Sequence, residues 1–245
     1  MNIIPLDEKR VPVLSANDIE LKAEEVIEFF NLDVLNQPCK TPLEFIVEET
    51  STRFKVVFDF EQDLGGDAPN RKTLGKFIFS PRAILIDKSL KDDIRFAFVF
   101  GHEFGHLVFH RKLIIKKKGY EDMDISDTAK DLVTGKKIFR TPRDWLEWQA
   151  NRFSSALLMP RATLKTALLQ IQERLNIRRN QGLVIVESAP YSKRDFENTL
   201  VGLQEVYGVS KRSIEFRLDD LGLLIDRRMK DTKHISEILM ERNLS

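Results

Sequence analysis

Hydrophobic positions along the chain recur with two periods, and each period predicts one kind of element. Over residues 16–31 apolar side chains return every three or four positions, which predicts an amphipathic helix with one buried face. Three apolar runs at residues 54–60, 76–79 and 83–87 indicate strands. Residues 94–100 are nearly all apolar, as expected for a core helix buried on most sides. Together these elements predict an α+β fold with a small antiparallel or mixed sheet.

Two helix starts can be placed from capping residues. Residues 89–92 hold a serine and, three positions later, an aspartate, so we expect the apolar helix to begin at Ser89 as its N-cap. Residues 141–144 hold an N-cap threonine, a proline and an aspartate, which predicts a second helix. That helix should end at Met159 and Pro160, because proline cannot continue it.

The C-terminal third has the outline of a helix-turn-helix. We expect a helix over residues 161–175 and a short strand over residues 183–186. Residues 200–222 then contain, in order, a helical pattern, a glycine turn, a serine cap, a second helical pattern and a glycine stop.

These elements divide the chain into three predicted parts. Residues 1–175 form the main domain, residues 190–225 a helix-turn-helix-like helical subdomain, and residues 226–245 a C-terminal tail or helix. Within the main domain, residues 111–140 break the apolar pattern and form a long insertion. Such an insertion serves either as a lid or substrate contact, or as a solvated loop.

Composition narrows the classes of partner. The 245 residues carry a formal net charge of +1, so no overall attraction to nucleic acid or membrane is implied. The single cysteine, Cys39, excludes an internal disulfide and fits a reducing compartment. The first residues lack a basic region followed by an apolar one, and no apolar stretch approaches the ~20 residues of a membrane helix. We therefore expect a cytoplasmic protein without a membrane partner.

A histidine cluster carries the strongest chemical signal. Residues 101–110 contain the pattern H-E-x-x-H, with His102 and His106 four positions apart on the expected helix. Residues at that spacing share a helix face, so both imidazoles can bind one metal ion. Glu103 is adjacent and can take a proton from a metal-bound water. The pattern is typical of zinc-assisted peptide hydrolysis.

A zinc peptidase needs a third protein ligand. His110 lies eight residues after His102, so a continuous α-helix would separate the two by about 12 Å, too far to share one ion. Glu147 on the second helix is the better candidate. Asn151 lies one turn later on the same face, where its side chain can accept a hydrogen bond from the outer N–H of a ligand histidine and fix its tautomer. The alternative is that Glu147 is an ordinary surface glutamate.

Three segments resemble the ImmA/IrrE family of metallo-endopeptidases. That family is marked by "HELGH", by "E-x-x-A-N-x-F-A-x-x-L-L-M-P" and by an "F-G-V-S…R-L…L-G-L" segment, and the counterparts here are residues 96–110, 147–160 and 207–223. The resemblance implies a zincin-like core with an active-site helix. It also implies that His102, His106 and Glu147 bind zinc, with Glu103 as the catalytic base.

The same resemblance implies a substrate. Members of the family cleave, or are encoded beside, helix-turn-helix repressors of mobile elements or stress regulons, so cleavage derepresses transcription. We expect the repressor to be a separate protein. For contact with substrate or the transition state, His110, Tyr191 and Tyr120 are candidates, and the strand at residues 83–87 could offer an edge to an extended peptide.

Two functions of other classes compete with the peptidase. The chain could be a zinc-containing DNA-binding regulator that approaches phosphate with Lys211, Arg212 and Arg217. Acidic residues in the same helix and the near-zero net charge oppose this, so we expect the helix pair to serve packing and direct nucleic-acid binding to be absent. The chain could also be a catalytically silent interaction protein of the toxin–antitoxin kind.

Overall fold

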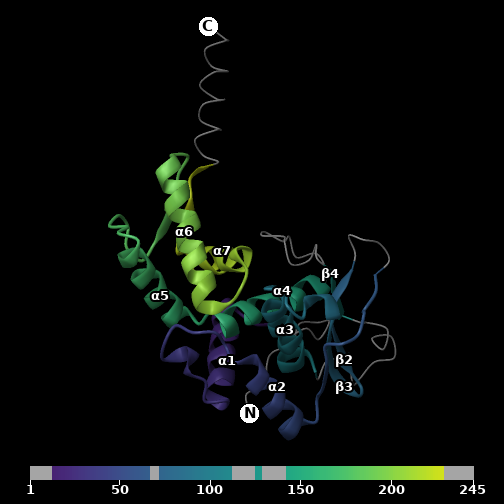
Figure 1. The fold of residues 1–245 in the computed structure, drawn as a ribbon. Coiled ribbons are helices and arrows are strands. Elements are labelled where there is room, and N and C mark those ends of the chain that lie inside the picture. The colour runs from purple at the N-terminus through teal and green to yellow at the C-terminus, as the bar shows by residue number, and fades with distance from the viewer. Residues whose placement is uncertain (1–12, 67–71, 112–124, 129–141, 229–245) are drawn as a thin grey trace. The chain divides into compact units, whose positions relative to one another are not determined.

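The computed structural model describes residues 13–66, 72–111, 125–128 and 142–228. The chain divides into two compact units, residues 1–160 and residues 161–245, which are described separately. Figure 1 shows the helices and strands of both units. Both contain helices and a small sheet, so the predicted α+β class is confirmed.

The helices of the first unit place one buried helix among amphipathic ones. Those helices are α1 (Ala16–Phe29), α2 (Leu43–Phe54), α3 (Phe96–Gly105) and α4 (Pro142–Leu158). The predicted N-terminal helix is confirmed as α1, which begins with a complete capping box between Ser15 and Asp18. The second predicted helix is confirmed as α4, which begins at Pro142 and ends before Met159 and Pro160 as expected. Its predicted N-cap, Thr141, lies outside the described residues.

Helix α2 was not predicted from the sequence, which indicated a strand from residue 54 onward. The helix includes Phe54 and ends at Lys55, which caps it in the left-handed conformation with φ of 56°. Short helical turns complete the unit: η1 (Asp33–Leu35), η2 (Lys88–Leu90) and η3 (His106–His110), the last of these a π-helix.

The start of α3 was predicted wrongly. Ser89 does not cap it, because the buried Asp87 accepts hydrogen bonds from the Ser89 backbone N–H at 2.9 Å and from its hydroxyl. Lys72 pairs with the same carboxylate at 2.8 Å. These bonds hold the η2 turn, and α3 begins only at Phe96. From there it is the buried core helix that the sequence indicated.

The first sheet has the order β1-β3-β2-β4. Its strands are β1 (Val57–Asp59), β2 (Thr73–Phe79), β3 (Arg82–Ile86) and β4 (Ile125–Thr128). Strand β3 pairs in parallel with β1 and antiparallel with β2, and β2 also pairs antiparallel with β4. Because β3 has a neighbour on each side, it has no free edge, and the expectation that it pairs with a substrate peptide is wrong. Of the predicted insertion at residues 111–140, the described part is Arg111 and β4.

The second unit contains α5 (Arg161–Arg174), β5 (Val184–Val186), α6 (Pro190–Tyr207), α7 (Lys211–Asp220) and β6 (Leu224–Asp226). Strands β5 and β6 form a parallel pair. The predicted helix at residues 161–175 and strand at 183–186 are confirmed. The unit begins at Arg161, the first residue of α5, whereas the sequence placed the end of the main domain at residue 175. The functional domain limits stay a prediction, and residues 229–245 lie outside the described part.

Helices α6 and α7 are joined by the predicted turn, in which Gly208 is left-handed and Ser210 caps α7. Arg217, one of the three basic residues that the DNA-binding alternative would place against phosphate, is fully buried. Lys211 pairs with Glu197 at 3.1 Å, and Arg212 pairs with Glu215 at 3.3 Å. The arrangement favours packing for this helix pair, and its likeness to a helix-turn-helix stays a prediction. Among the described helices, none has the length and apolar character needed to cross a membrane.

Candidate metal centre

Helices α3 and α4 carry the candidate ligands, and two glycines allow these helices to lie close together. A Cβ at Gly101 would come within 2.5 Å of the Ser154 hydroxyl, and one at Gly105 within 3.1 Å of the Ala150 Cα. Any larger residue would push α4 away from α3. The Ser154 hydroxyl also donates to the Phe98 carbonyl at 2.8 Å, which ties the helices together.

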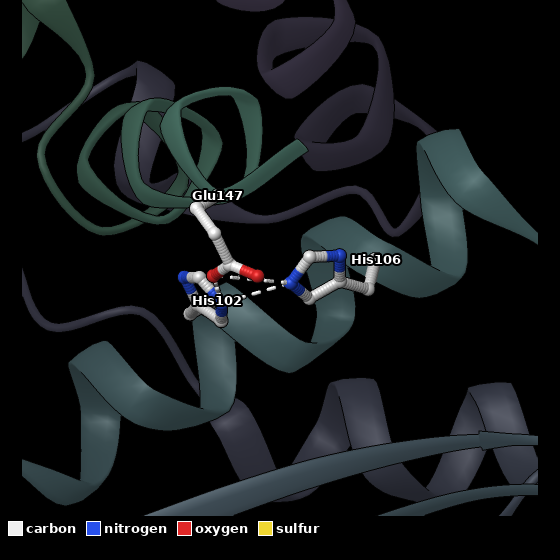
Figure 2. Close-up of side chains that lie close together, drawn as sticks. All are labelled: His102, His106 and Glu147. Carbon is white, nitrogen blue, oxygen red and sulfur yellow. Dashed lines mark hydrogen bonds and ion pairs between the residues drawn. The ribbon is translucent and has the colours of Figure 1, made fainter. Parts of the chain in front are cut away.

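Three predicted side chains converge between these helices. His102 and His106 project from one helical run and Glu147 from α4, and Figure 2 shows all three pointing toward one another. The two Nε2 atoms lie 2.8 Å apart, and Glu147 Oε2 lies 3.3 Å from that of His102 and 3.9 Å from that of His106. All three side chains are buried. The structure therefore brings Glu147 to the histidines and not to the surface.

These separations fit a tetrahedral ion. Ligands held about 2.1 Å from such an ion lie about 3.4 Å from one another, a value within the spread of the three distances. The outer oxygen of Glu147, Oε1, lies 3.7 Å from Arg143 Nε on the same helix. The Glu147 carboxylate thus presents one oxygen to the two histidines and the other to the Arg143 guanidinium.

Asn151 lies where the sequence placed it. Its Oδ1 is 2.8 Å from His102 Nδ1. Because an amide oxygen can only accept, His102 donates its Nδ1–H, and its Nε2 then carries a lone pair. Asn151 therefore fixes the tautomer in which His102 can bind a metal.

His110 is fully buried on η3, and both of its ring nitrogens have partners. Its Nδ1 is 2.7 Å from His106 Nδ1, and its Nε2 is 3.0 Å from Gln149 Oε1. His110 therefore lies behind His106 and is not a third ligand, as the spacing argument predicted. The role proposed for it in substrate contact stays a prediction.

The histidine environment favours neutral rings. Burial, together with His102, His110 and Arg143, lowers the pKa of His106 well below its usual value. Burial lowers the pKa of His110 to about 4, against the opposing effects of the Gln149 hydrogen bond and the Glu147 charge. Neutral imidazoles have a lone pair to offer, and a metal ligand must have one.

Glu103 is buried and lies against β2. A Cβ on Gly75 would come within 2.4 Å of Glu103 Oε1 and within 2.8 Å of Val99 Cγ1. Only a glycine at this position leaves room for the carboxylate. Sequence reasoning missed Gly75, because a glycine within a strand has no signature that names the helix residue it faces.

Sequence reasoning also missed Gln149. Its only signal was its place two residues after Glu147. Tyr191 is half exposed on α6 of the second unit, and Tyr120 lies outside the described residues. The structure thus brings together His102, His106, Glu147 and Asn151 within the first unit.

Comparison with known families agrees with this constellation. A family model described as the IrrE N-terminal-like domain, Peptidase_M78, matches residues 66–219, a span that includes all of the side chains above. A comparison with curated proteins found no match. The model covers more than half of the chain, so the chain belongs to the ImmA/IrrE-type family of metallopeptidases.

Proposed function

We propose that the protein is a zinc-dependent endopeptidase. The observation that carries the proposal is the convergence of His102 Nε2, His106 Nε2 and Glu147 Oε2 within a buried site. Two imidazoles and one carboxylate are a ligand set that zinc peptidases use, with the fourth position open to water. When bound, zinc would make a coordinated water more acidic and polarise the scissile carbonyl.

The chain's own residues divide the remaining work. Glu103 follows His102 directly and is held by β2, so its carboxylate can accept the proton of the attacking water and return it to the leaving amine. Asn151 keeps the His102 lone pair aimed at the metal position. Glu103 on α3 thus acts as the base, and Asn151 on α4 orients a metal ligand, so both roles are performed from rigid helices.

The substrate we propose is a separate helix-turn-helix repressor whose cleavage derepresses stress or mobile-element genes. Family membership and the three family-like segments support this substrate class. The test is incubation of the zinc-loaded protein with the repressor encoded beside it, with Glu103→Gln as the control. Cleavage by the native protein alone supports the proposal. An intact repressor in both reactions, with zinc bound, would refute it.

The competing DNA-binding function has less support. The burial of Arg217 and the ion pairs of Lys211 and Arg212 leave little free positive charge on α7. A silent interaction protein is distinguished by the same cleavage assay, since a silent protein would bind the repressor and leave it uncut in both the native and the Glu103→Gln forms.

A further inference from the structure

A chain of two hydrogen bonds runs from α4 to the back of His106. Gln149 Oε1 lies 3.0 Å from His110 Nε2, and His110 Nδ1 lies 2.7 Å from His106 Nδ1. All three side chains are fully buried. Buried polar groups are normally paired, so the protons along this chain must be ordered in one consistent way.

The direction of the chain follows from its first member. The Gln149 oxygen can only accept, so His110 donates its Nε2–H. A neutral His110 then has a lone pair at Nδ1, which can only accept. His106 must therefore donate its own Nδ1–H to His110, and this leaves the lone pair of His106 on Nε2. That is the atom 3.9 Å from Glu147 Oε2 and 2.8 Å from His102 Nε2.

The local backbone makes this contact close. Residues 106–110 form a π-helix, with the ring centroids of His106 and His110 4.9 Å apart. A π turn contains more residues than an α turn, so side chains four positions apart lie more nearly one above the other. Such turns are uncommon and are found often at functional sites.

We propose that Gln149 and His110 are positioning residues for the metal: together they hold His106 in the tautomer whose Nε2 binds the ion. This inference rests on the metal site of the proposed function. Asn151 fixes the tautomer of His102 by a direct hydrogen bond, whereas Gln149 acts on His106 through the ring of His110. Neither Gln149 nor His110 touches substrate or metal in this role.

The test is zinc affinity, measured by competition with a chromophoric chelator. Gln149→Leu and His110→Ala should each weaken zinc binding by ~10–100-fold, as loss of a partner behind a ligand histidine does elsewhere. In this proposal Gln149 acts on the metal site through His110, so the double variant should bind zinc within about twofold of His110→Ala alone. Gln149→Glu keeps an acceptor at the same place and should keep zinc affinity.

A matched control separates positioning from packing. Ser154→Ala removes a buried hydrogen bond between the same two helices without contacting a ligand, so it should lower the melting temperature and leave zinc affinity unchanged. Native zinc affinity for both Gln149→Leu and His110→Ala, with only lowered melting temperatures, would overturn the proposal. Additive losses in the double variant would also overturn it. If His110→Ala does not fold, the comparison of zinc affinity between Gln149→Leu and Gln149→Glu tests the proposal on its own.

Failure of the underlying metal site would look different. In that case the native protein would bind zinc no better than His102→Ala, and both the metal site and the positioning role would be refuted. If the native protein binds tightly and the Gln149 variants do not differ from it, only the positioning role fails.

Discussion

Replacing Gly75 by alanine should disable the peptidase through Glu103 while leaving the metal ligands in place. The new Cβ would lie 2.4 Å from Glu103 Oε1 and 2.8 Å from Val99 Cγ1. Strand β2 is paired on both sides, so the backbone has little freedom to move away. The carboxylate must therefore shift by roughly 1 Å, a misplacement that can cost ~100-fold in rate.

That loss corresponds to about 2.7 kcal/mol of transition-state stabilisation. It should appear in kcat for repressor cleavage by the zinc-loaded protein, with the zinc content of the variant unchanged. Overpacking should lower the free energy of unfolding by about 1–3 kcal/mol. The matched control is Gly202→Ala in the second unit, where a Cβ would come within 2.9 Å of Ile171 Cγ2. That variant should also lose stability but keep its kcat.

The reasoning is refuted if Gly75→Ala folds, binds zinc and cleaves the repressor at the native rate. In that case Glu103 either tolerates the displacement or does not act as the base.

Three further changes test separate parts of the structure. Asn151→Leu should weaken zinc binding by ~10–100-fold, because His102 loses the acceptor that fixes its tautomer, and calorimetric titration would show native affinity if that bond were unimportant. Burial alone would raise the pKa of Asp87, but hydrogen bonds from Lys72, Ser89 and Leu64 hold it far below its usual value. The ionised Asp87 therefore stabilises the fold at any pH above the pKa that it has in the unfolded chain, and this stabilisation is lost as the pH falls below that value. Asp87→Asn should therefore lower the free energy of unfolding by about 1–3 kcal/mol near pH 7, with the difference from the native protein shrinking on acidification below pH ~4; a difference that grows would contradict the assignment. Reversing the charges of Lys211 and Arg212 should leave stability nearly intact and at most weaken repressor cleavage, whereas salt-sensitive, sequence-specific duplex binding that those changes abolish would favour a DNA-binding role.

The sequence predicted elements best where local signals were strong. Helix α1 lies within the residues 16–31 that apolar spacing predicted, and α4 begins at Pro142, the proline predicted as its first helical residue. The predicted start of α3 was wrong because Asp87, two residues before Ser89, accepts hydrogen bonds from the Ser89 hydroxyl and backbone N–H. A capping motif can be recognised from the sequence alone, but a competing acceptor such as Asp87, which pairs with Lys72 just before β2, cannot.

Strand order lay beyond the sequence for a related reason. Strand β3 is apolar enough for either an interior or an edge position, and only the parallel pairing of Val57 with Ala83 places it inside the sheet. Helix α2 was missed because its β-branched and aromatic residues favour strands, although Ile46 and Thr50 are buried at helical spacing.

The candidate site divides in the same way. The spacing of His102, His106 and Glu147, read with the family resemblance, was enough to propose the ligands, and Asn151 followed from its place one turn after Glu147. The sequence could not connect Gly75 to Glu103, which lie on different elements. The link from Gln149 to His106 was hidden as well, because it passes through a third side chain.

Zinc content measured together with repressor cleavage tests the central claim most directly. The native protein and Glu103→Gln should each hold about one zinc per chain, and only the native protein should cut the repressor, since the variant loses the base but no ligand. Glu147→Ala should lose the metal and the activity together. Full zinc content and native cleavage by Glu147→Ala, or substantial turnover by Glu103→Gln, would contradict the account.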